Sequence, residues 1–220
     1  MLVTLHVWRV PRRRIAAAML QLARARRHQA RFVKFLGTSN GFELKNADLT
    51  RYAAVTVSDR PVDYPAWNRL AVQRAVVELD PLHSRGSWSG RKPFEAGSKE
   101  AAARKPDGTV LAITRARLRP TRAFRFWQAI PPVIRELHTA PGLLAGFGIG
   151  EAPIGWQGTV SVWRDAADLT RFAYRQPEHR AVIARTAADR WYAEELFARF
   201  AVRGITGDRS VLGWLEEGQT

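Results

Sequence analysis

The chain has 220 residues, with 35 Lys and Arg against 20 Asp and Glu, which gives a formal net charge of +15. It contains no cysteine, and this excludes disulfides, zinc knuckles, iron–sulfur clusters and a thiolate-ligated haem within the chain. Any tightly held iron must therefore use histidine, tyrosine or carboxylate ligands.

The positive charge is distributed along the whole chain. The excess is almost entirely arginine, extends from Arg9 to Arg209 and accompanies abundant alanine. Nucleic-acid-binding proteins concentrate their basic residues on one face. The pattern therefore favours an anionic membrane surface or an acidic partner over nucleic acid.

No stretch of the sequence approaches the roughly 20 apolar residues that span a bilayer. The apolar run in MLVTLHVWRVPRRR is too short for the core of a signal peptide, and its basic cluster follows the run instead of preceding it. We expect a cytoplasmic protein whose membrane association is limited to peripheral contact.

The first half of the chain alternates between strand and helix patterns. Alternating apolar residues predict strands, and apolar residues at three- and four-residue spacing predict helices. The predicted order is strand, helix, strand, strand, helix, over residues 2–10, 11–29, 31–37, 52–58 and 64–79.

The same order begins again at Thr109. A strand over residues 109–119 precedes a helix opened by Pro120. A glycine-broken stretch (142–150), a strand (159–164), a helix containing His179 and a closing strand (195–203) follow.

Short matches between the halves support a duplication. Phe35-Leu36-Gly37 resembles Phe147-Gly148, and VTVSD at 55–59 resembles VSVWRD at 160–165. Two βαββαβ units predict an α+β fold, in which two ferredoxin-like repeats form one dimeric-α+β-barrel-type structure. We divide the chain into an N-terminal repeat (1–80), a Gly-, Ser-, Pro- and Lys-rich connecting segment (81–108), a C-terminal repeat (109–203) and a tail (204–220).

Five histidines are the candidate iron ligands. For His6, His28 and His138 we expect structural or solvent-exposed roles. His83 begins the segment LHSRGSWSGRKPF, whose Arg85 and Trp88 make it a candidate pocket segment.

His179 differs from the other histidines because it lies on an apolar helix face. At 100° per residue, Val182 and Ile183 fall on its side of the predicted helix, and Arg190 lies further along nearly the same side. Such a histidine is most often a packed core residue. An axial haem ligand, however, must also project from a helix into apolar surroundings. The pattern alone leaves both interpretations open.

Other chemistries find no support in sequence motifs. The chain contains no GxSxG, P-loop or HExxH motif. Glu194 and Glu195 are neighbours at the start of a predicted strand, where successive side chains point to opposite faces, so they form a poor acid–base pair.

Several ordered blocks of the sequence resemble the spheroidene monooxygenase family of carotenoid biosynthesis. The blocks cover residues from about 80 to 203. They are SRGSWSG (84–90), PF (93–94), ITRA (113–116), RP (119–120), FW (126–127), GIGEAP (148–153), SVWRD (161–165) and WYAEELFARF (191–200).

This resemblance implies a haem b protein that uses dioxygen and external electrons, for example from a ferredoxin, to oxidise a hydrophobic substrate. In the named family the reaction introduces a keto group beside the terminal methoxy group of an acyclic carotenoid. The chain is also similar to the wider dimeric α+β barrel class, whose haem members include chlorite dismutases, dye-decolorising peroxidases and aldoxime dehydratases.

The resemblance assigns roles to particular residues. In that class a histidine on a helix of one repeat takes the proximal position, which makes His179 the expected iron ligand. The other candidates are Arg115, Thr114 and Ser161 as distal proton donors or positioning groups, Phe147 and Trp156 as pocket walls, Arg85, Trp88 and Arg190 near the propionates, and Val182 and Ile183 beside the ligand.

Two rival functions remain open at this point. The first is a haem-dependent dehydratase or peroxidase-like enzyme of the same fold, and the second is a haem-free basic binding module. The sequence also leaves open the substrate, the electron donor and whether the chain forms a homo-oligomer.

Overall fold

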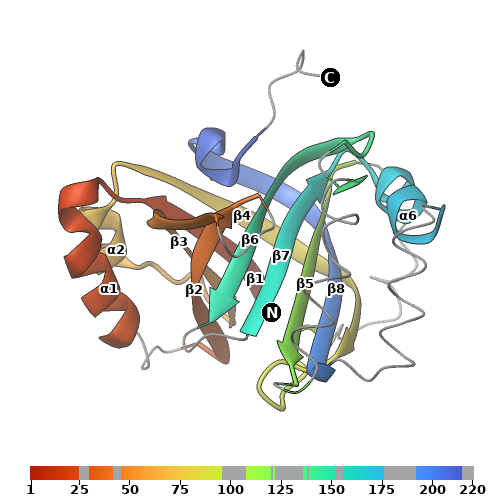
Figure 1. Cartoon of the computed structure of the whole chain (residues 1–220), viewed down its shortest axis with the longest axis horizontal. Helices are drawn as coiled ribbons and strands as arrows, with labels where there is room; N and C mark the ends of the chain where they lie inside the picture. Colours follow the sequence, from red (N-terminus) through yellow and green to blue (C-terminus); the bar gives the residue numbers. More distant parts are fainter. Residues whose placement is uncertain are drawn as a thin grey trace.

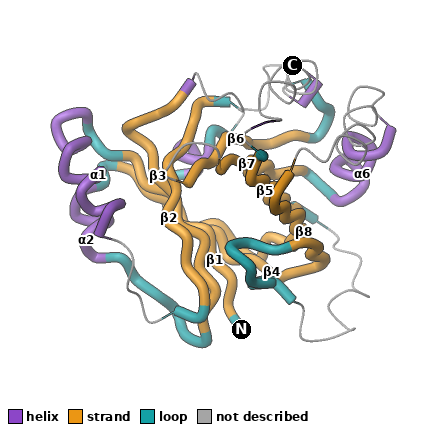
Figure 2. The backbone as a smooth tube through the Cα atoms, turned by 60° about the horizontal axis from the view of Figure 1, so that its bottom comes forward, coloured by secondary structure: helices purple, strands orange, loops and turns teal. Residues whose placement is uncertain are grey.

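The structure is a computed structural model that describes residues 1–24, 30–41, 46–95, 108–119, 121, 136–137, 139–151, 156–175 and 192–214. Within these residues, eight strands close into an antiparallel barrel in the order β1-β3-β2-β6-β7-β5-β8-β4 (Figures 1 and 2). The strands are β1 (Leu2–Arg9), β2 (Phe32–Asn40), β3 (Ala47–Ser58), β4 (Gln73–Gly86), β5 (Val110–Leu118), β6 (Leu143–Glu151), β7 (Trp156–Trp163) and β8 (Tyr192–Gly207). The described helices are η1 (Arg12–Arg14), α1 (Ile15–Arg24), α2 (Pro65–Leu70), α6 (Ala166–Arg175) and η4 (Arg209–Leu212).

The barrel consists of two repeats with the same strand order. The first repeat runs β4-β1-β3-β2 and the second runs β8-β5-β7-β6, which is the ferredoxin-like arrangement. Pairing of β2 with β6 and of β4 with β8 joins the two sheets into one barrel. The predicted fold class, two ferredoxin-like repeats in one α+β barrel, is confirmed.

The helix predicted over residues 64–79 is wrong for most of its length. Only Pro65–Leu70 is helical, and β4 begins at Gln73. Ala75, Val77 and Leu79 alternate into the barrel core, because pairing with β1 on one side and β8 on the other fixes this segment as a strand. The strand continues to Gly86, so the boundary predicted at residue 80 falls inside β4.

The barrel interior is a packed apolar core. Trp88 and Phe94, which follow β4, belong to this core at one end, and Val211 and Leu212 of η4 belong to it at the other. All four side chains are fully buried. The interior is therefore filled by side chains, as in other small barrels.

The outer face of the first repeat is covered by α1 and α2, on the opposite side of the molecule from α6 (Figure 1). Aromatic rings fill the space between the sheet and these helices. Trp8 stacks on Trp67 with ring centroids 5.3 Å apart, and Tyr64 meets Trp8 edge-on at 5.6 Å. Phe35 stacks on Trp67 at 5.9 Å.

His6 belongs to the same aromatic layer. Its ring lies 4.9 Å from Tyr64, and its Nε2 is 3.1 Å from the hydroxyl of Thr4. Burial lowers the pKa of His6 to about 4, against a smaller opposing effect of Asp63. His6 is therefore a packed, neutral histidine near pH 7.

We expect the His6→Phe variant to lose part of the pH dependence of stability. The usual histidine pKa is 6.5 and the folded value is about 4, so the unfolded chain binds more protons between these pH values. Stability contributed by neutral His6 is present above pH 6.5 and is lost as the pH falls towards 4, by about 3 kcal/mol at most. Urea unfolding at several pH values measures this loss.

The control for this prediction is His83→Phe, because His83 lies at an exposed position of β4. It should retain the wild-type slope of unfolding free energy against pH. A wild-type slope in His6→Phe as well would contradict the prediction.

No described helix is long and apolar enough to cross a membrane.

Candidate functional site

The predicted distal residues lie on two different faces of the second repeat. Side chains alternate along a strand, and Leu111 and Ile113 of β5 point into the barrel core while Ala112 packs in the outer cluster with Trp163 and α6. Thr114 therefore faces outward, as does Ser161 on β7. Arg115 faces inward and is only 3% exposed.

Small side chains form one part of the outer surface of the second sheet. We call this surface the outer floor, and it consists of Ala112, Thr114, Ala116, Gly146, Gly148, Thr159 and Ser161. Register pairs Thr114 with Thr159 and Thr159 with Gly148, and their neighbours Ala112, Ser161 and Gly146 form the next row.

Hydroxyl groups on the outer floor are held in place by hydrogen bonds. The Oγ1 atoms of Thr114 and Thr159 are 2.6 Å apart, and Trp163 Nε1 donates to Ser161 Oγ at 2.9 Å. The floor therefore offers fixed hydroxyls between small side chains.

The corresponding face of the first repeat is filled with aromatic rings. Leu2 pairs with Ser58 where β1 begins and β3 ends, and Val110 pairs with Trp163 at the same point of the second repeat. Counting along the strands from these pairs, His6 corresponds to Thr114 and Trp8 to Ala116. Phe35 corresponds in the same way to Gly148. Large rings in one repeat are thus replaced by small residues in the other.

At Gly148 the hydroxyl of Ser39 occupies the place where a side chain would lie. The other two positions carry only a threonine and an alanine. The second repeat therefore carries small side chains at the three positions that correspond to the rings of His6, Trp8 and Phe35.

The connection between the last two strands of the second repeat is also longer than its counterpart in the first. Residues 59–72 link β3 to β4, whereas residues 164–191 link β7 to β8, which is twice the length. Its described part, α6, packs Phe172 against Trp163 with ring centroids 5.3 Å apart. His179, Val182, Ile183 and Arg190 lie outside the described residues, after the end of α6.

The remaining predicted pocket residues do not lie together on one face of the sheet. The Arg85 guanidinium lies 4.6 Å from the centre of the Phe197 ring, and Phe197 pairs with Thr114, so Arg85 borders the outer floor. Phe147 lies in the barrel core, 4.8 Å below the guanidinium of Arg51, and does not line the floor. Trp156 begins β7, and its side chain is outside the described part.

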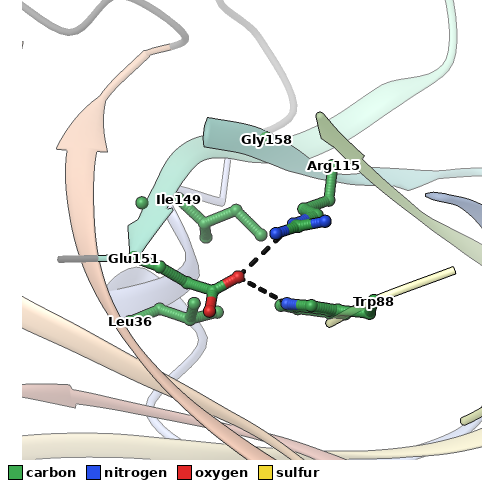
Figure 3. A pocket seen from close by; sticks show the side chains of 7 residues that line it. Leu36, Trp88, Arg115, Ile149, Glu151 and Gly158 are labelled. Atoms are coloured by element: carbon green, nitrogen blue, oxygen red, sulfur yellow. Dashed lines mark hydrogen bonds and ion pairs between the residues drawn. The ribbon is translucent and has the colours of Figure 1, made fainter. Parts of the chain in front are cut away.

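A buried polar cluster lies inside the barrel near its Trp88 end (Figure 3). The cluster consists of Lys34, Trp88, Arg115, Glu151 and Glu194. Arg115 forms ion pairs with both glutamates, with Nε 3.3 Å from Glu151 Oε1. Glu151 also accepts from Trp88 Nε1 at 2.5 Å and from Lys34 Nζ at 2.9 Å. Two cations and two anions therefore balance each other.

The polar cluster does not form a ligand pocket. The space between Leu36, Trp88, Arg115 and Glu151 leaves no room for a water molecule. Its charged groups form ion pairs with one another, which is the usual condition for keeping charges inside a protein core.

Glu194 anchors the turn that follows β4. Its carboxylate accepts from the backbone N–H of Gly90 at 2.7 Å, from Ser87 Oγ at 2.9 Å and from the N–H of Ser89 at 3.1 Å, in addition to its pair with Arg115. Burial opposes ionisation, but these donors outweigh it and lower the pKa of Glu194 to about 2. Ser89 and Gly90 have φ values of 54° and 71°, so Glu194 holds a left-handed turn as a permanent anion.

Comparison with known proteins identifies the family. No family model matches the chain. A spheroidene monooxygenase from Rubrivivax gelatinosus is 33% identical over 189 residues, covering 81% of this chain and 71% of that protein. The chain belongs to the spheroidene monooxygenase family.

Two further likenesses are to a second relative and to a solved structure. A spheroidene monooxygenase from Rhodobacter capsulatus is 35% identical over 152 residues, or 68% of this chain, and the chain spans 62% of that relative's length. The crystal structure of an aldoxime dehydratase, 10% identical, superposes with a TM-score of 0.54 and covers 91% of this chain and 80% of its own. The second likeness shows a shared fold.

Four of the blocks that carry the family resemblance meet at the polar cluster. Trp88 comes from SRGSWSG, Arg115 from ITRA, Glu151 from GIGEAP and Glu194 from WYAEELFARF. Blocks that are far apart in the chain thus converge on one buried ion-pair network.

Sequence reasoning missed Glu151 and Glu194 as members of this network. Glu194 and Glu195 were predicted to be a poor acid–base pair because they point to opposite faces, and this argument overlooked an inward carboxylate that accepts four hydrogen bonds. The available signal was the presence of both glutamates in blocks that carry the family resemblance, Glu151 in GIGEAP and Glu194 in WYAEELFARF.

Proposed function

We propose that this member of the spheroidene monooxygenase family is a haem b-dependent monooxygenase that oxidises a hydrophobic substrate with dioxygen and external electrons. Family membership supports the reaction class. The single structural observation that carries the proposal is the outer floor, where small residues stand at positions that the first repeat fills with aromatic rings. In the proposal a planar, largely apolar cofactor lies against these small side chains.

Three features of the described residues are suited to haem. The side chains of the outer floor are small, Phe197 adds an apolar ring at its border, and the Arg85 guanidinium beside that ring can hold a carboxylate. In the proposal His179 is the iron ligand, Val182 and Ile183 lie beside it, and Arg190 is a second partner for a carboxylate. Haem held in this way supplies the activation of dioxygen.

The chain's own residues have defined tasks in this proposal. The hydroxyls of Thr114 and Thr159, 2.6 Å apart, form a short path along which a proton can move on the floor. The hydroxyl of Ser161, which accepts a hydrogen bond from Trp163 Nε1, is a fixed polar group in the neighbouring row of the floor. Arg115 lies on the other face of the sheet, so its role here is to hold the polar cluster beneath the floor.

The substrate class in this proposal is a long apolar molecule with an activated methylene, such as an acyclic carotenoid. Each hydroxylation inserts one oxygen atom, and two electrons and two protons reduce the other to water. A second hydroxylation of the same carbon, followed by loss of water, gives a ketone. An acidic ferredoxin-type donor suits the basic surface of the chain.

The test is a haem titration of the purified chain followed by absorption spectroscopy. Wild type should develop a Soret band, and His179→Ala should lose haem or change its coordination. The exposed His83→Ala variant serves as the matched control and should keep the wild-type spectrum. An unchanged spectrum in His179→Ala would remove His179 as ligand, and a wild type without a Soret band would favour a haem-free binding module.

Turnover assays distinguish the oxygenase from its nearest rival. A monooxygenase requires both dioxygen and a reductant. Turnover of an aldoxime without oxygen, or turnover with peroxide alone, would instead assign a dehydratase or peroxidase-like activity on the same fold.

A further inference from the structure

Helix α1 exposes an apolar face to solvent. Ala18 is its buried residue, and Leu22 packs beside it against the aromatic layer. At 100° per residue, Ala16, Leu20 and Ala23 lie on the opposite side. Leu20 is 50% exposed, and Met19 at the flank of this face is 47% exposed.

Surface helices normally carry polar side chains on their outer face. The outward face of α1 instead carries alanine, leucine and methionine, with Arg24 at its C-terminal end as its charged residue. An exposed face of this kind indicates a partner surface.

The charged residues that flank α1 in the sequence are all positive. Arg12 and Arg13 of η1 are exposed immediately before the helix, and Arg24 is exposed at its end. Arg14 donates to the carbonyl oxygens of Arg69 and Leu70, which fixes η1 against α2. The sequence has no Asp or Glu among residues 1–42. An anionic partner therefore complements this face.

We propose that α1 and η1 dock this protein onto an anionic lipid bilayer, with Leu20 and Met19 entering the headgroup region and Arg12, Arg13 and Arg24 contacting lipid phosphates. An interfacial helix has this combination of an apolar face and arginines. The charge of the segment complements that of the bilayer surface.

A second copy of the chain is the less suitable occupant. A two-fold contact through α1 places the arginines of one copy against those of the other. A helix of 10 residues is about 15 Å long and offers much less than the roughly 800 Å² per partner of a stable interface.

The position of α1 is compatible with access to the outer floor. Helices α1 and α6 lie on opposite sides of the molecule in both views (Figures 1 and 2). Docking through α1 therefore leaves the second repeat uncovered, and the proposal holds whether or not haem binds there.

Sedimentation with vesicles tests the proposal. The full chain should bind vesicles that contain phosphatidylglycerol and should remain unbound with pure phosphatidylcholine. Each arginine contributes roughly fivefold to binding, so Arg12→Glu/Arg13→Glu should bind at least about 25-fold more weakly. The matched control, Arg60→Glu/Arg209→Glu, makes the same change of charge at exposed positions outside η1 and α1 and should bind like wild type.

The absence of cysteine allows a second, local readout. An environment-sensitive fluorophore on Leu20→Cys should brighten and shift to the blue on anionic vesicles, whereas the same label on Ala167→Cys, exposed on α6, should not respond. Both measurements use folded protein, which circular dichroism verifies for each variant.

Three results would overturn the proposal. They are absence of vesicle binding by wild type, equal weakening by the two double variants, and a response of the α6 label in place of the α1 label. Concentration-dependent association that Leu20→Glu abolishes, without any vesicle binding, would assign the face to a second copy of the chain.

Discussion

Arg115→Met should lower the free energy of unfolding by about 3–5 kcal/mol at neutral pH. Methionine retains most of the apolar volume of the arginine stem but removes the cation that pairs with Glu151 and Glu194. The Arg115 side chain is 2% exposed and those of the two glutamates are 9% and 15% exposed, so water cannot replace the lost partner fully. Urea denaturation followed by tryptophan fluorescence measures the change.

The control for Arg115→Met is Arg117→Met on the same strand. Arg117 is exposed, and its replacement should change the free energy of unfolding by less than about 1 kcal/mol. Adding Glu194→Gln to Arg115→Met removes one uncompensated charge and should recover part of the stability. A loss of less than about 1 kcal/mol in Arg115→Met would show that the cluster does not hold this end of the barrel together.

Thr114→Trp should weaken haem binding by about 100-fold while the barrel remains folded. The indole would lie on the outer floor and occupy the space proposed for the cofactor. His6 and Trp8 fill the corresponding positions of the first repeat in the same way. Forcing extra volume into a packed site costs about 1–3 kcal/mol, equivalent to roughly 5- to 150-fold in affinity. Titration of the purified variant with haem, monitored at the Soret band, gives the affinity.

Thr114→Val separates the effect of volume from that of the hydroxyl. Valine has the shape of threonine but cannot make the 2.6 Å contact with Thr159. It should bind haem with nearly wild-type affinity and lose turnover if the hydroxyl path moves protons. Full haem affinity in Thr114→Trp, and also in Ala116→Phe on the same face, would place the cofactor elsewhere.

The two predictions concern opposite faces of one strand. Arg115 is expected to affect stability because its side chain points into the barrel, and Thr114 is expected to affect the cofactor because its side chain points out. Neighbouring residues on β5 thus serve separate purposes. A comparison of their variants distinguishes a structural network from a binding surface.

Much of the architecture could be predicted from the sequence. The spacing of apolar residues marked β1, β3, β5 and β7, and the match between VTVSD and VSVWRD identified the duplication. The blocks from SRGSWSG to WYAEELFARF identified the family. These signals are local, because each depends on residues within one strand, helix or turn.

Strand β4 could not be predicted, because its identity depends on residues far away. The segment following Pro65 has apolar spacing that also fits a helix, and pairing with β1 and with β8 decides between the two. Propensity is a weak guide where both neighbours are supplied by distant parts of the chain.

The sequence by itself determined the repeat order, the family, the choice of histidine for the proposed iron site and the surplus of arginine around α1. The tertiary structure decided which face of the sheet each predicted residue occupies, and it separated Thr114 and Ser161 from Arg115 and Phe147. It also brought Trp88, Arg115, Glu151 and Glu194 together. The physical reason is that a two-residue period shows that neighbouring side chains point apart, whereas barrel closure and strand register determine which of them is buried in the core.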